Sequence, residues 1–217
     1  MPVFVITGND TGVGKTRVTA ALARELSRLG GAVQIVKPVE TGILPGGHGD
    51  AETALRHASG KAEAHTLFRF AEPMSPPDAA KREGFTLTLE SMLERYRRLP
   101  PAAWRLVEGA GGIASPLDTE GRDVCDFAAA IGADALILVV EHRLGAICQA
   151  RLAHAYAARA GVPVWLWLNQ IRPESEAVLL SNREALTGYN LPLCAVLGPD
   201  AQEPDWLERP WQATPSR

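Results

Sequence analysis

Five short apolar runs constrain the fold of this chain of 217 residues more than any other feature. Each run is largely continuous in its apolarity, whereas a strand with one solvated face alternates apolar and polar residues. Continuous runs are typical of strands that are buried on both faces, as in a parallel sheet with helices on each side. The runs cover residues 3–6, 32–36, 104–107, 135–140 and 162–168.

Segments with helical periodicity lie between these runs. The clearest begins at Thr16 and continues until Gly30 and Gly31 end it, since glycine is common just past a helix C-terminus. The alternation of strands and helices predicts a doubly wound α/β fold with a mostly parallel sheet flanked by helices. Ligands of such folds gather beyond the carboxyl ends of the strands. Further helices are predicted over residues 50–58, 86–98, 124–131, 146–160 and 174–187.

The composition is that of an ordinary globular protein, with 46% hydrophobic and 22% charged residues. We find no internal repeat or long linker, so we expect one domain over residues 1–217. Residues 199–217 lack periodicity and are rich in proline and tryptophan, which predicts an irregular tail along the surface. Within it, we interpret Trp206 and Trp211 as packing anchors.

The charge and the cysteines exclude several classes of partner and site. A net charge of −3 provides no global positive field for a nucleic acid or an anionic membrane. No apolar run is long enough to span a bilayer, and no targeting segment is evident. The three cysteines are widely spaced without a CxxC pair, which argues against disulfides and zinc. These features favour a protein of the cytoplasm.

A glycine-rich loop follows the first run and leads directly into the first helix. In this strand–loop–helix context, backbone N–H groups and the helix N-terminus hold phosphates, the lysine reaches the terminal phosphates, and the threonine hydroxyl binds Mg²⁺. The loop is one residue longer than the general GxxxxGK[ST] pattern. It predicts a nucleotide site formed by Gly8, Asn9, Asp10, Thr11, Gly12, Val13, Gly14, Lys15 and Thr16.

Two carboxylates are candidates for the metal that accompanies a nucleotide. Glu108 ends an apolar run and precedes glycines, the position at which an acid meets the metal opposite Thr16. Asp50 stands at the start of a predicted helix, where aspartate is a common N-cap. The residues alone leave a cap or a second metal ligand open for Asp50.

Other polar and glycine positions also follow predicted strands. Lys37 ends a buried run, where a lysine has few structural uses, so we expect it to bind an anion. Thr41 begins a turn beside it, and its hydroxyl is a candidate substrate contact. Gly111 and Gly112 either direct backbone N–H groups at an oxyanion or form a plain tight turn.

The histidines and cysteines suggest no catalytic role. The five histidines show neither metal spacing nor a nucleophile partner, so we interpret them as surface or incidental residues. Cys148 lies near the start of a predicted helix, and we expect it to be a small buried packing residue. The histidines are His48, His57, His65, His142 and His154.

Several linked motifs resemble one family, the dethiobiotin synthetases, whose N-terminal loop reads Gly-Thr-Asp-Thr-x-Val-Gly-Lys-Thr. Asn9 is the one difference at the fixed positions of that loop. The resemblance covers roughly residues 1–170. Its other elements are Lys37-Pro-Val-Glu-Thr-Gly42, Phe70-Ala-Glu-Pro-Met-Ser-Pro76, Glu108-Gly-Ala-Gly-Gly112, Leu144-Gly145 and Asn169.

The resemblance implies a specific reaction. 7,8-Diaminononanoate, CO₂ and MgATP give dethiobiotin, ADP and phosphate through an N-carbamate and a carbamic–phosphoric anhydride. It also implies a homodimer whose active sites are each completed by the neighbour's Leu144-Gly145 region. The implied roles are Lys15, Lys37 and Thr11 in catalysis, Thr16, Asp50 and Glu108 at the metal, Asn169 at adenine, and Thr41, Gly111, Gly112, Leu144 and Gly145 at the substrate.

The sequence also departs from the family pattern, which leaves two alternatives open. Pro77 stands where the family often has histidine, Cys148-Gln149 where Asn-His is common, and residues 199–204 lack the usual Gly-Glu-Ile-Pro. One alternative is a related ligase or kinase with an altered small substrate. The other is an ATPase switch of the partition and division-site type, although such switches typically carry lysine at the position of Asn9.

Overall fold

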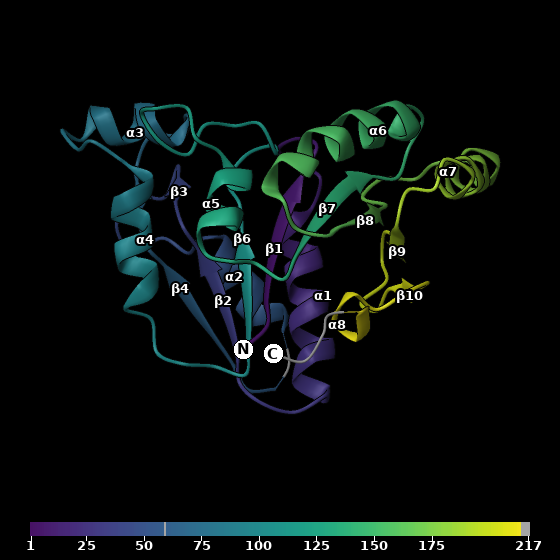
Figure 1. Ribbon diagram of the computed structural model, residues 1–217, viewed down its shortest axis with the longest axis horizontal. Helices are drawn as coiled ribbons and strands as arrows, with labels where there is room; N and C mark the ends of the chain where they lie inside the picture. The colour runs from purple at the N-terminus through teal and green to yellow at the C-terminus, as the bar shows by residue number, and fades with distance from the viewer. Residues whose placement is uncertain (59, 214–217) are drawn as a thin grey trace.

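An eight-stranded sheet forms the frame of the protein in the computed structural model, which describes residues 1–58 and 60–213 (Figure 1). The strand order is β10-β9-β8-β7-β1-β6-β2-β4, and all neighbours are parallel except the antiparallel pair β9 and β10. The predicted mostly parallel sheet is therefore confirmed. Its strands are β1 (Val3–Gly8), β2 (Val33–Lys37), β4 (Ala62–Thr66), β6 (Trp104–Glu108), β7 (Ala135–Glu141), β8 (Val164–Asn169), β9 (Leu193–Leu197) and β10 (Asp205–Trp206).

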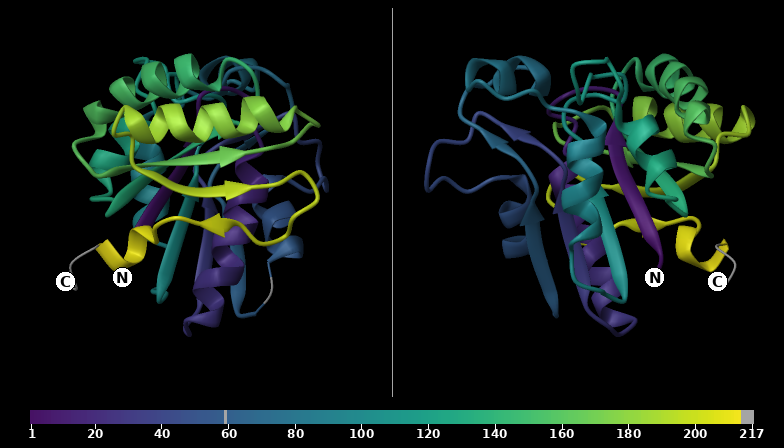
Figure 2. Two further views of the ribbon diagram at one scale, coloured as in Figure 1. Left: turned by 90° about the vertical axis from the view of Figure 1, so that its right-hand side faces the viewer. Right: turned by 60° about the vertical axis from the view of Figure 1, so that its left-hand side comes forward.

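Helices cover both faces of the sheet (Figure 2). Phe4 and Ile6 of β1 belong to the apolar core under α1 and α2, whereas Val3 and Val5 belong to the core under the helices of the opposite face. Both faces of β1 are thus buried, which explains its continuous apolar run. The helices are α1 (Lys15–Arg28) and α2 (Asp50–His57) on one face, and α4 (Leu89–Arg97), α5 (Val124–Ala130), α6 (Ala146–Ala157) and α7 (Glu176–Gly188) on the other.

The register of the strands brings the predicted site residues to one edge of the sheet. Ile6 of β1 lies opposite Glu108 of β6, and Val36 of β2 lies opposite Val107. Lys37 and Glu108 therefore end neighbouring strands, beside the loop that follows β1. Asn169 ends β8 and lies opposite Glu141 of β7. These predicted site residues therefore lie where ligands of such folds gather.

Several elements were not predicted from the sequence. They include β4, β9, α3 (Pro76–Arg82), and a separate two-stranded sheet of β3 (Glu40–Thr41) and β5 (Arg69–Phe70). The last turn of the helix predicted over 146–160 is a 3₁₀ helix, η1 (Ala158–Ala160). The helix predicted over 86–98 begins only at Leu89, because Thr88 caps it: its hydroxyl accepts the N–H of Ser91 at 3.1 Å. Local capping chemistry thus set a boundary that periodicity had placed too early.

The C-terminal segment is more ordered than the prediction of an irregular tail. β10 pairs with β9, and a one-turn helix, α8 (Pro210–Ala213), follows. Trp206 packs edge-on against Trp167 and Trp211, with ring centroids 5.2 and 5.0 Å apart, so the predicted packing role of the two tail tryptophans is confirmed. Residues 214–217 of the predicted tail lie outside the described residues.

The helices of residues 1–58 and 60–213 fall short of a membrane span in length or apolarity.

Candidate active site

The glycine-rich loop turns sharply between β1 and α1. Gly12 and Gly14 have φ of 77° and 85°, in the left-handed region that glycine adopts without steric cost. Gly14 is the N-cap residue of α1, so the N-terminus of that helix opens directly onto the loop. The Nζ of Lys15 donates to the carbonyl of Asp10 at 3.0 Å and so lies folded over the loop. This is the arrangement that a phosphate-binding loop requires.

A cavity of about 340 Å³ joins this loop to residues that follow β2 and β6. It contains most of the residues predicted for catalysis, the metal and the substrate, together with the polar Glu40 and the apolar Ile43 and Ala110, which had no predicted role. Its lining includes Thr11, Gly12, Gly14, Lys15, Thr16, Lys37, Glu40, Thr41, Asp50, Glu108 and Gly111.

A buried ion-pair cluster forms the floor of this cavity. The ammonium of Lys37 lies 2.7 Å from the Oδ2 of Asp50 and 2.9 Å from the Oε1 of Glu108. The side chains of Lys37 and Glu108 are 3% and 1% exposed, so this pair lies out of water. The hydroxyls of Thr16 and Thr19 donate to the two oxygens of Glu108 at 3.0 and 2.8 Å. A buried carboxylate needs such partners, because an unpaired charge out of water is costly.

The charges of the cluster shift the pKa values of both lysines. Burial acts to lower the pKa of Lys37, but the carboxylates of Glu108 and Asp50 outweigh burial and hold the pKa above its ordinary value. Lys15 has fewer such partners: burial and the neighbouring charge of Lys37 lower the pKa of Lys15 to about 8. Lys37 is therefore a permanent cation, whereas Lys15 is poised to titrate.

The oxygens around Lys37 also form a set of donors suited to a metal. The hydroxyl of Thr16 and the carboxylates of Asp50 and Glu108 are hard oxygen ligands, the kind that Mg²⁺ prefers. The two carboxylates converge on the ammonium of Lys37, and the hydroxyl of Thr16 donates to Glu108 beside it. The predicted metal ligands therefore come together, and their chemistry fits Mg²⁺.

Glu40 is the cavity residue that sequence reasoning missed. It is buried, its Oε1 accepts the N–H of Asp50, and its Oε2 has no hydrogen-bond partner. Burial raises the pKa of this carboxyl. Its place between Lys37 and Thr41 in a recognised motif was the available signal.

Asn169 is buried and joins β8 to the phosphate loop. Its Nδ2 donates to the carbonyl of Val13 at 2.7 Å, and its Oδ1 accepts from Arg17 at 3.1 Å. In this structure, the amide thus holds the loop in place. A contact between Asn169 and adenine stays a prediction.

The two glycines after β6 differ in position. Gly111, with φ of 67°, lines the cavity, whereas Gly112 faces the loop, where a Cβ would come within 3.3 Å of the carbonyl of Asn9. The N–H of Gly112 donates to the Oγ of Ser115 at 2.9 Å. The expectation that both N–H groups are turned toward an oxyanion is therefore not met for Gly112, which instead permits close packing.

Sequence comparisons place this site in a known family. A family model described as an AAA domain matches residues 3–198. The chain is 35% identical to the ATP-dependent dethiobiotin synthetase of Mycolicibacterium vanbaalenii, over 96% of this chain and 98% of that protein. It is 39% identical to the enzyme of the same name from Mycobacterium avium, over 91% of this chain and 87% of that protein.

The chain belongs to the ATP-dependent dethiobiotin synthetase family. This is a family of ligases that form a carbon–nitrogen bond. Solved structures with low identity support the fold alone. MinD in the MinC–MinD complex of Aquifex aeolicus has a TM-score of 0.54 at 15% identity, over 93% of this chain and 83% of that one. FtsY of Mycoplasma mycoides has a TM-score of 0.57 at 13% identity, over 96% and 64%.

Two residues that depart from the dethiobiotin synthetase pattern contact each other. The Nδ2 of Asn9, in the loop, donates to the Oε1 of Gln149, on α6, at 3.0 Å. A third departure, Pro77, lies in the first turn of α3. The first two departures thus form one link between the phosphate loop and α6.

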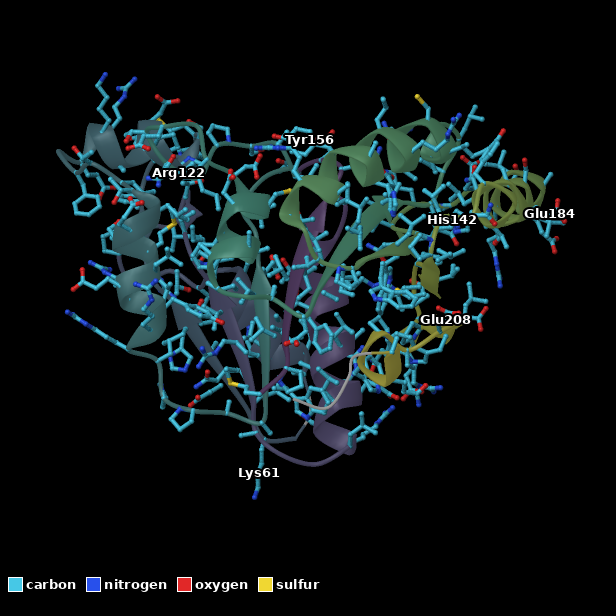
Figure 3. All side chains as sticks on the ribbon, viewed as in Figure 1. Lys61, Arg122, His142, Tyr156, Glu184 and Glu208 are labelled. Atoms are coloured by element: carbon cyan, nitrogen blue, oxygen red, sulfur yellow. The ribbon has the colours of Figure 1, made fainter. Side chains whose placement is uncertain are left out.

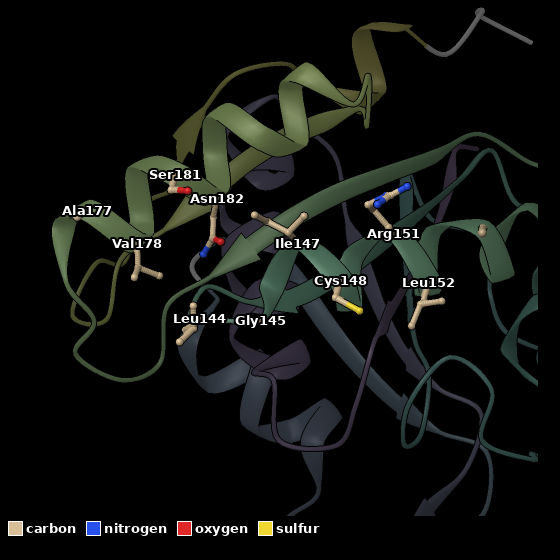
Figure 4. Close-up of a pocket in the computed structure, with 11 residues that line it drawn as sticks. Leu144, Gly145, Ile147, Cys148, Arg151, Leu152, Ala177, Val178, Ser181 and Asn182 are labelled. Carbon is tan, nitrogen blue, oxygen red and sulfur yellow. The ribbon is translucent and has the colours of Figure 1, made fainter.

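Leu144 and Gly145 lie outside the phosphate cavity of their own chain. They line a shallow cavity of about 860 Å³ between α6 and α7, together with Ile147, Cys148 and Leu152 (Figure 4). The prediction that Cys148 is a buried packing residue is wrong: it is exposed, because this side of α6 faces away from the sheet. Leu144 is 72% exposed.

One histidine also departs from its predicted surface position. His142 follows β7 and is buried beneath α7, where its Nε2 lies 3.1 Å from the carbonyl of Leu179 (Figure 3). Burial lowers the pKa of His142, which favours a neutral ring. It takes no part in the phosphate cavity.

Proposed function

We propose that this protein is a dethiobiotin synthetase that converts 7,8-diaminononanoate, CO₂ and ATP into dethiobiotin, ADP and phosphate. The observation that carries the proposal is the buried cluster of Lys37, Asp50 and Glu108 beside Lys15 and Thr16 in one cavity. Family membership supplies the substrates, and the cavity supplies cations and oxygen ligands where phosphoryl transfer needs them.

The reaction calls for positioning more than for acid–base chemistry. One amine of the substrate adds to CO₂ and loses a proton, which gives a carbamate anion. A carbamate oxygen then attacks the terminal phosphorus of ATP, and ADP leaves. The second amine then attacks the carbonyl carbon of the mixed anhydride, and phosphate leaves as the ring closes. The nucleophile of the phosphoryl transfer is already anionic, so orientation and charge stabilisation lower the barrier. This agrees with a cavity whose lining includes no histidine.

The residues of the cavity divide these tasks. Lys15 and the loop N–H groups hold the terminal phosphates. Lys37, which keeps its proton at neutral pH, pairs with the carbamate anion, and Thr11 and Thr41 contact the same end of the substrate. Gly111 allows the backbone to approach it closely. The positions of these side chains around one cavity support the proposed roles.

A Mg²⁺ ion would be held by Thr16, Asp50 and Glu108. Bound there, it would supply charge neutralisation for the phosphates of ATP. Asp50 suits this role because its pKa is lowered: burial acts to raise it, but the charge and hydrogen bond of Lys37 outweigh burial. The carboxylate is therefore ionised at neutral pH.

We further propose that the protein acts in the cytoplasm as a homodimer whose sites lie at the interface. Leu144, Leu152 and Leu180 are exposed on or beside α6 and α7, which is an apolar surface of the kind that a second copy covers. A neighbour bound through this face would bring its own Leu144-Gly145 segment to the phosphate cavity. The exposed Leu144 would then contact the aliphatic part of the substrate.

A product assay tests the proposed function. The purified protein is given MgATP with the diamine and bicarbonate together, or with either one alone, and both ADP and dethiobiotin are measured. We expect the two products in equal amounts and only in the complete mixture. ADP formation that does not depend on the diamine would contradict the proposal and favour an ATPase switch. Product formation with other diamines but not with 7,8-diaminononanoate would favour a ligase with an altered substrate.

A further inference from the structure

A second cavity adjoins the phosphate site. Its volume is about 610 Å³, and it lies between α1, α2 and the segment of residues 198–203, which we call the strap. It shares Gly14 and Thr16 with the phosphate cavity. Because Lys15 and Thr16 face the terminal phosphates, the rest of a bound nucleotide extends into an adjoining space. The second cavity is an adjoining space of this kind, on the α1 side of the loop.

Arg17 connects the three parts of the chain that meet at this cavity. It follows Thr16 in the first turn of α1. Its Nη1 donates to the Oδ1 of Asn169 at 3.1 Å and to the carbonyl of Gln170 at 3.0 Å. Its Nη2 donates to the carbonyl of Ala201 at 2.6 Å and to that of Gly198. One guanidinium thus binds the end of β8 and two carbonyls of the strap, those of Gly198 and Ala201.

The strap depends on such contacts for its position. β9 ends at Leu197 and β10 begins at Asp205, so the strap belongs to neither strand. Besides Arg17, Arg24 on α1 donates to the carbonyl of Gln202. A planar guanidinium with five donors in a fixed fork suits several carbonyls at once, whereas the ammonium of a lysine does not span them.

We propose that Arg17 is a positioning residue for the nucleoside part of the nucleotide. It holds the strap, whose Ala201 and Gln202 line the second cavity, in place as a preformed wall of the nucleoside site, so that binding need not order it. This inference rests on the proposed function only in that a nucleoside triphosphate is the co-substrate. Loss of the wall raises the ordering cost of binding the nucleoside and leaves the phosphate loop itself unchanged.

The test compares two ligands that share the phosphates but not the nucleoside. Calorimetry measures the dissociation constants of MgATP and of magnesium tripolyphosphate for the wild type, Arg17→Met and Arg17→Lys. For both variants, we expect ATP to bind about tenfold more weakly or worse, with tripolyphosphate unchanged. Arg17→Lys keeps the positive charge, so it separates the role of the fork from a general attraction of anions. Steady-state kinetics should show a raised KM for ATP with the kcat and the KM of the diamine preserved.

Arg28→Gln is the matched control. Arg28 lies on the same helix and contacts the strap through the exposed side chain of Glu203 rather than through a backbone carbonyl, and it does not line the second cavity. It should bind both ligands as the wild type does. Equal weakening of ATP and tripolyphosphate, or unchanged ATP affinity in a folded Arg17→Lys protein, would overturn the inference. A wild type that binds ATP but makes no dethiobiotin would instead overturn the proposed function and leave the role of Arg17 standing.

Discussion

The phosphate cavity and the α6–α7 face lie at the same edge of the sheet but are built in opposite ways. Around the cavity, charged side chains are buried and paired: the carboxylate of Glu108 accepts hydrogen bonds from Lys37, Thr16 and Thr19. On the α6–α7 face, apolar side chains such as Leu144 and Leu152 are exposed at 72% and 70%. Buried charges carry a desolvation cost even when they are paired, and exposed leucines carry a cost of contact with water.

The difference indicates what each region requires. Buried charges with satisfied partners are preorganised for a charged ligand, so the cavity can act with little rearrangement. Covering exposed leucines stabilises an assembly, which supports our proposal that a second copy covers this face. A change in one region should leave the folding and the charge pairing within the other region unaffected.

The largest effect is expected from Lys15→Ala. This change removes the point charge on the terminal phosphates, and we expect turnover to fall by about a thousandfold or more. Circular dichroism and thermal unfolding should show a folded protein, and its assembly state should match that of the wild type. Near-normal turnover in this folded variant would rule out the cavity as the nucleotide site.

Glu108→Gln should affect both magnesium binding and stability. The amide keeps the shape of the side chain but removes a charge that a hard cation requires, so we expect the magnesium needed for half-maximal activity to rise about tenfold or more. The buried ammonium of Lys37 also loses a paired charge, which should lower the free energy of unfolding by roughly 3 kcal/mol.

A double variant separates these two effects. Lys37→Met with Glu108→Gln removes both buried charges, so stability should recover in part while activity stays lost. An unchanged magnesium requirement in Glu108→Gln would remove Glu108 from the set of metal ligands.

These residues illustrate how far the sequence could predict the site. Lys37 and Glu108 were predictable, because each ends a buried strand in a parallel sheet, and such ends share an edge. Their direct ion pair was not, because it depends on strand order: β6 lies between β1 and β2, although it follows them by many residues in the chain. The role of Arg17 was likewise hidden, since its partners lie more than 150 positions away.

The exposed face shows the converse limit. Helix 146–160 was predicted from its small apolar residues, and the structure places it over nearly that range as α6 and η1. Apolar residues lie on more than one side of this helix, so periodicity could not identify the side that faces the sheet. Cys148 was therefore assigned to the core, whereas the buried side is formed by alanines such as Ala146, Ala150 and Ala153.

On the α6–α7 face, Leu152→Glu should prevent assembly. A glutamate placed in an apolar interface must be desolvated without a partner, which costs several kcal/mol. Sedimentation should show a dimer for the wild type and a monomer for this variant, with activity reduced about tenfold or more because each site lacks its neighbour. Leu207→Glu is the matched control, since Leu207 is 45% exposed but follows β10, away from this face. A dimeric Leu152→Glu protein would contradict the assignment of the face.

A smaller effect is expected from pH, and it should be confined to the cavity. The pKa of Lys15 is lowered to about 8, so its ammonium carries a proton below that pH and loses it above. The affinity for ATP should therefore be steady near neutral pH and fall by up to about tenfold per pH unit above the pKa. Calorimetry at a series of pH values measures this fall. Lys15→Ala should bind weakly with no such dependence, and an equal fall in that variant would assign the titration to another group.

The smallest effect concerns Cys148, which reports on the α6–α7 face without changing it. Cys148 is exposed, whereas Cys125 and Cys194 are buried and burial raises the pKa of both thiols. An alkylating reagent should thus modify one thiol per chain, which mass spectrometry locates.

In a dimer formed through this face, the neighbour covers Cys148, so its rate of modification should fall severalfold as protein concentration rises through the dimer dissociation constant. Leu152→Glu should react at the fast rate at every concentration. Sedimentation of the same samples shows whether they pass from monomer to dimer. If they do, and the modification rate of the wild type is still independent of concentration, then the chains pair through another surface and Leu144 does not reach the neighbour's phosphate cavity.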